Sequence, residues 1–238
     1  MALLGGPNII DSGLIIALDA ANPLSYPGSG TAWNDVTING YNTTLTNGPT
    51  FNSANGGSIV FDGSDDYAGA LSTPDILEGD PNLTVCGWFK RTESGIEYSG
   101  AWGIGGESTD GGINCWNYAN TNEITIDTWN RSTFTSGVTY PLNEWVFVAW
   151  QKIAGPMTRA NCIIWRNLTS YTGNQLSILR GEGPAPTIND YGFTLGSISR
   201  TTGYCVGINI ANFYVYNRIL NPSEIAQNYN ATKGRFGL

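Results

Sequence analysis

The sequence predicts an all-β protein made of two packed antiparallel sheets, with one short helix near the C-terminus. Only 13% of its 238 residues are charged, and 31 glycines and 11 prolines interrupt its apolar runs. Those runs are short and rich in Val, Ile, Thr, Tyr and Trp. Short β-branched and aromatic runs between turn residues are typical of antiparallel sandwiches.

A single domain is expected over residues 13–238, preceded by an N-terminal arm over residues 1–12. With 41% hydrophobic residues the chain can bury one sizeable core, and all-β sandwiches of this length are commonly one domain. The arm has no periodicity and contains Gly5, Gly6 and Pro7, so it is expected to lie outside the core, where it could contact a neighbouring molecule.

Strands are expected wherever a short β-branched or aromatic run lies between turn residues. The first is the apolar segment 14–19, which is followed by a long loop around Trp33 and a short strand at 43–45. The runs between residues 97 and 137 are spaced as in a meander. The longer strands are expected at residues 83–90, 97–106, 112–118, 123–129, 132–137, 145–152, 161–166, 192–197 and 206–216.

Residues 56–68 have the pattern of a β-hairpin. A β-branched and aromatic run precedes the turn sequence Asp-Gly-Ser-Asp-Asp, and Tyr67 starts the return strand. Aspartates in such a turn commonly accept hydrogen bonds from their own backbone. The three carboxylates of Asp62, Asp65 and Asp66 also suggest calcium as an alternative, although calcium takes about six or more oxygen ligands.

One helix is predicted at about residues 222–231. Asn221 can cap it, Pro222 suits the first helical position, and Glu224 stands three residues after the cap. This is the arrangement of a capping box, in which the cap and the glutamate bond to each other's backbone.

Charge and cysteine usage argue against several classes of function. The net charge is −8 and the 11 basic residues are scattered, so neither nucleic acid nor a membrane is an expected partner. The N-terminus shows neither a secretion signal nor a membrane span. There is no histidine, so a zinc site is not expected. The cysteines are far apart and are expected to be reduced thiols; they are Cys86, Cys115, Cys162 and Cys205.

Five segments carry a family resemblance: 13–19 (GLIIALD), 58–67 (SIVFDGSDDY), 83–89 (LTVCGWF), 144–150 (EWVFVAW) and 210–220 (IANFYVYNRIL). In this order they resemble the concanavalin A-like lectin/glucanase domains of the laminin-G-like and pentraxin type. The resemblance spans residues 14–231. It implies a jelly-roll sandwich.

A narrower resemblance concerns residues 19–49, residues 47–53 (NGPTFNS) and residues 229–238 (YNATKGRFGL). They look like parts of laminin-G-like domains in virion structural proteins of tailed bacteriophages. This resemblance implies a virion protein made in the cytoplasm of a bacterial host. Its expected partners are other virion proteins of the capsid or tail and further copies of itself.

No catalytic residue is expected. The nearest match to the carboxylates of glycoside hydrolases on this fold is Glu123 with Asp127, which strand alternation places on one face. Thr125 stands where the central carboxylate would be, and the two acids are about 13 Å apart at strand rise, more than either glycosidase geometry uses. Without histidine there is also no Ser-His or Cys-His nucleophile. The chain is therefore expected not to be an enzyme.

Carbohydrate binding would require aromatic side chains beside amides on a concave face, although most Trp and Tyr in a sandwich belong to the core. The central strands line the groove in relatives. The candidates on them are Trp102, Asn114, Trp116, Tyr118 and Trp129.

No cofactor is expected, and calcium at the 62–66 turn is the single alternative. Pentraxin-like relatives hold calcium between a loop that here contains Asp110 and acids that follow Leu195-Gly196. In this chain Ser-Ile-Ser-Arg follows instead, and Arg200 would repel the ion.

The expected function is a non-enzymatic virion structural protein, a capsid decoration or surface appendage with a lectin-like fold that adheres to the shell or to glycans. A receptor-binding tail protein, such as a tail fibre that recognises host surface polysaccharide, is the first alternative. An endoglycanase is the second.

Overall fold

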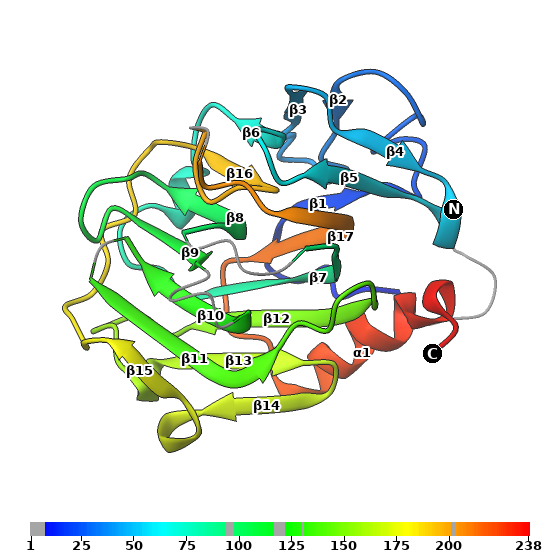
Figure 1. Ribbon diagram of the computed structural model, residues 1–238. Helices are drawn as coiled ribbons and strands as arrows, with labels where there is room; N and C mark the ends of the chain where they lie inside the picture. The colour runs from blue at the N-terminus through cyan, green and yellow to red at the C-terminus, as the bar shows by residue number, and fades with distance from the viewer. Residues whose placement is uncertain (1–7, 94–97, 117–121, 130, 201–202) are drawn as a thin grey trace.

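The computed structural model describes residues 8–93, 98–116, 122–129, 131–200 and 203–238, without the side chain of Trp116. Two antiparallel sheets pack face to face, and helix α1 lies on the outer side of one of them (Figure 1). The predicted all-β sandwich with one short C-terminal helix is confirmed. Among the described helices, none is long and apolar enough to cross a membrane.

Sheet A is built around its longest strand, β17. One edge of β17 pairs with β7, with a register shift at Ala211, and the other edge pairs first with β5 and then with β1 (Leu14–Asp19). The strand order of sheet A is β14 (Thr169–Thr172), β13 (Cys162–Arg166), β12 (Val146–Lys152), β7 (Leu83–Arg91), β17 (Gly207–Tyr216), β5 (Ser58–Asp62) and β4 (Thr50–Asn52).

Sheet B contains the predicted meander, because β8, β9, β10 and β11 are neighbours in chain order. Its other strands come from both ends of the chain. The strand order is β15 (Ser177–Arg180), β11 (Ser132–Thr139), β10 (Glu123–Thr128), β9 (Gly112–Trp116), β8 (Gly100–Gly105), β16 (Phe193–Leu195), β6 (Tyr67–Ala70), β3 (Thr43–Thr46) and β2 (Ala32–Trp33).

The segment 56–68 crosses from one sheet to the other, so the predicted hairpin is wrong. β5 pairs with β4 and β17 in sheet A, whereas β6 pairs with β3 and β16 in sheet B. Phe61 faces the core from one sheet and Ala68 faces it from the other. The turn reverses the chain in either arrangement, and only the pairing partners distinguish a crossover from a hairpin.

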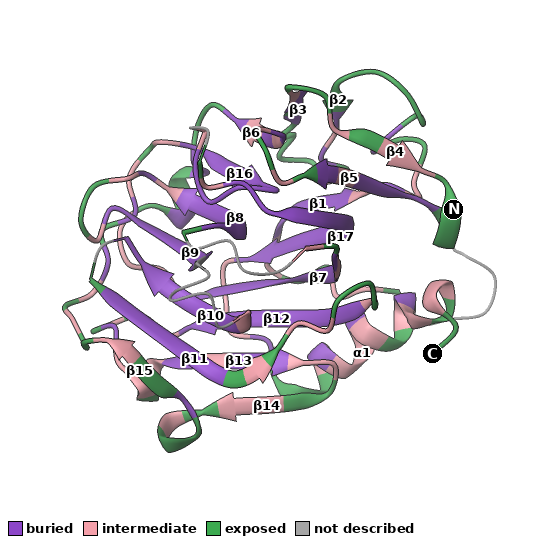
Figure 2. Ribbon diagram, in the orientation of Figure 1, coloured by how far each residue is buried: buried purple, intermediate pink, exposed green. Residues whose placement is uncertain are grey.

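The core between the sheets is rich in aromatic side chains. Trp150 of β12 contacts Phe89 of β7 and Trp102 of β8, with ring centroids 5.3 and 5.4 Å apart. Its indole nitrogen donates to the carbonyl of Thr125 at 2.7 Å, which ties sheet A to sheet B. Figure 2 shows β7, β12 and β17 buried along nearly their whole length, while β14 at the edge is intermediate or exposed.

Helix α1 (Pro222–Thr232) begins with the predicted capping box. Asn221 accepts from the backbone nitrogen of Glu224, and the Glu224 carboxylate accepts from that of Asn221. The helix and the turn after it cover the outer face of sheet A. There the Trp88 ring stacks on Phe236 and Tyr229, at centroid distances of 4.3 and 5.4 Å.

The described part of the predicted arm, residues 8–12, runs along helix α1 of the same chain. The backbone nitrogen of Ile10 donates to the side chain of Asn228, and its carbonyl accepts from the Tyr216 hydroxyl. Residues 1–7 of the arm lie outside the described part of the chain.

Candidate carbohydrate-binding face

The outer face of sheet B is opposite the side of the molecule that α1 covers (Figure 1). Register places Asp127 of β10 between Asn114 of β9 and Thr133 of β11 on this face. The Asn114 amide donates to one Asp127 oxygen at 3.3 Å, and the Thr133 hydroxyl donates to the other. A row of hydrogen-bonded polar side chains therefore crosses the middle of the sheet.

The two acids considered for catalysis lie on this face, as strand alternation predicts. Glu123 accepts a hydrogen bond from Thr135 at 2.5 Å, and Asp127 bonds to Thr133, two positions away on the same strand. Asp127 is fully buried, and burial raises its pKa to about 8, against the opposing effects of Thr133, Arg180 and Asn114. A carboxyl group in this position holds its proton at neutral pH and is not accessible to solvent.

Trp102 does not lie on the binding face, which corrects the prediction. Its ring is fully buried between the sheets, against Trp150 and Phe213. In β8 the side chains of Ala101, Trp102 and Ile104 all belong to the core.

The other predicted residues divide into two groups. Asn114 is on the outer face, but it is buried and bonded to Asp127. Trp129 is 8% exposed and packs against Ile198 and, edge to face, against Tyr204 at 5.4 Å. Tyr118 and the side chain of Trp116 lie outside the described part of the chain, so the predictions for them stay predictions.

Sequence reasoning missed a half-buried group on the same face, Tyr67, Tyr191 and Arg200, which we call the tyrosine–arginine cluster. The guanidinium carbon of Arg200 lies 4.4 Å from the centroid of the Tyr191 ring. A Cβ placed on Gly69 would lie 3.2 Å from the Tyr67 ring and 3.7 Å from Cδ of Arg200. The ring and the arginine stem therefore both lie over the bare backbone of Gly69.

A loop that folds back onto β8 positions Arg200. The carbonyl oxygen of Ile198 would be 2.3 Å from a Cβ at residue 103, so only glycine lets the loop lie this close. The hydroxyl of Thr194 donates to the carbonyl of Ser197 at 2.8 Å, and Ser199 bonds to the carboxylate of Glu107. The sequence signal for this cluster is the segment Tyr-Ala-Gly-Ala of β6, in which strand alternation places Tyr67 and Gly69 on the same face.

The chemistry of the tyrosine–arginine cluster is that of recognition. Aromatic faces stack on the apolar face of a sugar ring, and a guanidinium offers five donors to hydroxyl or carboxylate oxygens. Within the cluster there is neither a nucleophile with a base nor a pair of carboxylates, which acyl or glycosyl transfer would need.

The turn considered for calcium brings the oxygens of Asp62, Asp65 and Asp66 within 4.8 Å of one another. The backbone nitrogen of Asp62 donates to Asp66 at 3.0 Å, and that of Ser64 donates to Asp62 at 2.8 Å. Burial, and then the charges of the other two aspartates, raise the pKa of Asp66 against the backbone hydrogen bond that lowers it. These contacts are the turn caps expected from the sequence, and one oxygen from each carboxylate is about half of what calcium takes.

No family model and no curated protein matches the sequence. Among solved structures, domain 4 of an extracellular arabinanase from Geobacillus stearothermophilus, in complex with arabinotriose, matches with a TM-score of 0.65 and 14% identity, over 92% of this chain and 100% of that one. Trypanosoma rangeli sialidase in complex with sialic acid matches with a TM-score of 0.61 and 16% identity, over 97% of this chain. This chain spans 35% of the length of that sialidase. At such identities the likeness shows the fold.

Proposed function

We propose that the protein is a non-enzymatic, lectin-like module that binds carbohydrate on the outer face of sheet B, at the tyrosine–arginine cluster. The observation that carries this proposal is the cluster's position: Tyr67 and Arg200 lie over Gly69, Arg200 also lies over the Tyr191 ring, and all three are only partly buried. Aromatic residues that only stabilise a sandwich are normally buried in its core, as Trp102 is here.

The fold gives this proposal a second, weaker support. The arabinanase domain that this chain matches over its full length is described in complex with arabinotriose. Proteins of the same fold can have different functions, so the fold alone does not support carbohydrate as the ligand. The support comes from the fold together with the tyrosine–arginine cluster.

Substitution of the cluster tests the proposal. We expect Arg200→Ala and Tyr191→Ala each to weaken binding to an array of plant and bacterial polysaccharides by about tenfold, since each removes a contact worth about 1–2 kcal/mol. Far-ultraviolet circular dichroism is expected to stay unchanged, because neither side chain enters the core cluster.

The matched controls are Tyr171→Ala and Arg159→Ala. Tyr171 lies in β14 at the far edge of sheet A, partly buried against the core, and the Arg159 guanidinium makes a long ion pair with Glu182, at 3.8 Å. Both variants are expected to bind like the wild type. Equal binding by the cluster variants, or a wild type that binds no glycan on the array, would contradict the proposal.

We further propose that the module is a structural protein of a tailed-bacteriophage virion, made in the host cytoplasm and assembled with other virion proteins and with further copies of itself. The resemblance of residues 19–53 and 229–238 to phage proteins supports this. The loops also expose large apolar side chains suited to contacts within a particle, among them Leu24, Ile38 and Leu71.

Electron microscopy of purified particles tests this assignment. Antibody labelling of the protein, or density for it in a reconstructed map, is expected on the capsid surface. Density at the tail tip would instead favour the receptor-binding tail protein. Absence from infectious particles would overturn both versions.

The endoglycanase alternative rests on Glu123 and Asp127 sharing a face. The burial of Asp127 weighs against it. Hydrolysis of β-glucans by the wild type, lost in Glu123→Gln, would reinstate it.

A further inference from the structure

Arg91, the last residue of β7, carries a buried positive charge. The residue is only 4% exposed, and its Nε and Nη2 atoms are buried without a hydrogen-bond partner among the described residues. Burial lowers its pKa, but arginine stays protonated at neutral pH. A buried charge is destabilising unless its donors are satisfied, and among the described atoms Nε and Nη2 have no acceptor.

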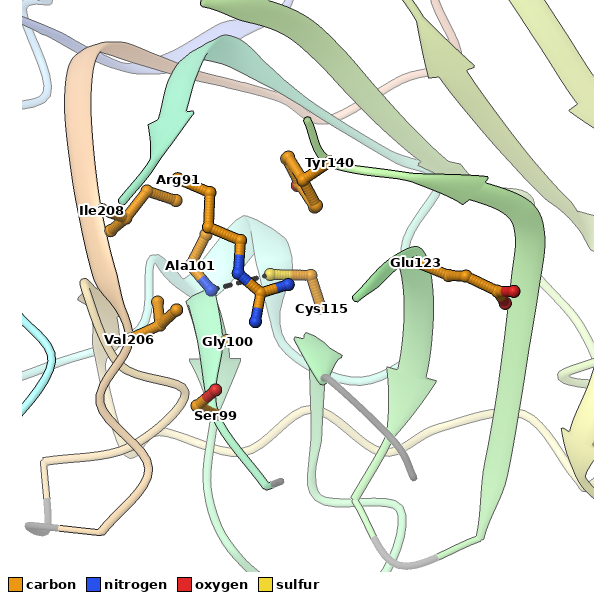
Figure 3. Close-up of a pocket in the computed structure, with 9 residues that line it drawn as sticks. All are labelled: Arg91, Ser99, Gly100, Ala101, Cys115, Glu123, Tyr140, Val206 and Ile208. Carbon is orange, nitrogen blue, oxygen red and sulfur yellow. Dashed lines mark hydrogen bonds between the residues drawn. The ribbon is translucent and has the colours of Figure 1, made fainter. Parts of the chain in front are cut away.

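The guanidinium points into a small cavity between the ends of the two sheets (Figure 3). Arg91 and Ile208 line it from sheet A, Ala101 and Cys115 line it from sheet B, and Tyr140 lines it from the segment after β11. The cavity measures about 20 Å³, which is room for one small molecule or ion. A sugar ring, a sulfate or a phosphate does not fit.

Among the described acids, Glu93 compensates part of the charge, since it raises the pKa of Arg91 against the lowering effect of burial. Glu123 is directed away from Arg91 in Figure 3 and bonds to Thr135. The Glu93 carboxylate accepts from the backbone nitrogen of Gly207.

The remaining polar groups at the cavity are neutral. Burial raises the pKa of the Cys115 thiol to about 12, and its sulfur accepts from the backbone nitrogen of Ala101 at 3.1 Å. The Tyr140 hydroxyl is buried and lacks a hydrogen-bond partner, and burial raises its pKa as well. The atoms left unsatisfied at the cavity are therefore two charged N–H groups and one neutral hydroxyl.

We propose that this cavity binds a single small inorganic anion of the size of chloride, held by Nε and Nη2 of Arg91 and the hydroxyl of Tyr140. The size of the cavity selects a monatomic ion, and the unsatisfied donors select a negative one. A water molecule would satisfy the donors but would add nothing to the partial compensation that Glu93 gives. The bound anion would join the end of β7 in sheet A to the segment after β11 of sheet B, and this site shares no residue with the tyrosine–arginine cluster.

Thermal unfolding in matched salts tests the proposal. At equal sodium concentration and pH, chloride is expected to raise the melting temperature above that in gluconate, with a shift that saturates as a one-site isotherm. Gluconate is the control because it is too large for the cavity. Arg91→Met is expected to abolish the chloride-specific shift and Tyr140→Phe to reduce it, while Arg159→Met, at an exposed ion pair, keeps it.

Crystals of the wild type soaked in sodium bromide give an independent answer, which does not depend on how the variants fold. An anomalous peak is expected beside Nε and Nη2 of Arg91. Equal melting temperatures in chloride and gluconate would overturn the proposal, as would a soaked crystal without a bromide peak in the cavity.

Discussion

At the scale of single residues, strand alternation decides which side chains can meet a ligand. Tyr67 and Trp102 are both aromatic residues of sheet B, yet Tyr67 lies on the outer face and Trp102 lies in the core. The sequence does not show which face of β8 enters the core, because the residues of β8 on both faces are buried up to Ile104. The loop around Ile198 covers the outer face of β8 at Gly100 and Gly103.

Asp127 makes the stability of the protein depend on pH. Its pKa is about 8 in the folded protein and close to 4 in the unfolded chain, so between these values the folded state holds the extra proton. Stability is therefore expected to fall as pH rises from about 4 to about 8. From pH 5 to pH 8 the loss is on the order of 3 kcal/mol.

The Asp127→Asn variant checks this expectation by urea denaturation across that range. An amide can keep accepting from one of these partners and can donate its NH2 to the hydroxyl oxygen of Thr133, but it does not titrate, so this part of the slope should disappear. Glu144→Gln, which removes an exposed carboxylate, is the control and should keep the wild-type slope. Parallel curves for the wild type and Asp127→Asn would show that Asp127 titrates normally.

At the scale of elements, local signals succeeded where the determining contacts are local. The helix was predicted from Asn221 and Glu224, because a capping box lies within four residues of chain. The strands β14 and β15 were missed. They are short, lie at sheet edges and are partly exposed, so neither shows the buried alternation that marks a strand.

At the scale of the whole molecule, the C-terminal turn closes the structure onto its beginning. Arg235 pairs with Asp19 at 2.8 Å and also donates to the carbonyl oxygens of Asn55 at 2.9 Å and Gly57 at 2.8 Å. These contacts link the first strand, the segment before β5 and the last turn of the chain.

Removal of this link should lower the stability of the whole sandwich. Arg235→Ala is expected to lower the free energy of unfolding by about 2 kcal/mol, because it breaks charge-assisted hydrogen bonds in a mostly buried setting. Arg235→Lys can keep the ion pair with Asp19 but not the other hydrogen bonds. Its free energy of unfolding should therefore lie between those of the wild type and of Arg235→Ala. Urea denaturation measures both.

Lys233→Ala is the matched control for this prediction. Lys233 is a neighbouring cation that lies over the ring of Tyr229 at 5.6 Å, and its removal should cost well under 1 kcal/mol. If Arg235→Ala were as stable as this control, the C-terminal turn would not hold the sandwich together.

The sequence by itself determined the all-β class, the meander, the capped C-terminal helix and the lack of a histidine-based nucleophile. These features depend on composition or on residues a few positions apart. The tertiary structure alone decided that β5 and β6 belong to different sheets, that Trp102 is buried, and that Tyr67 meets Arg200 and Arg91 meets Tyr140. The physical reason is that strand pairing joins residues far apart in the chain, and no local pattern records which face of a strand the rest of the protein will cover.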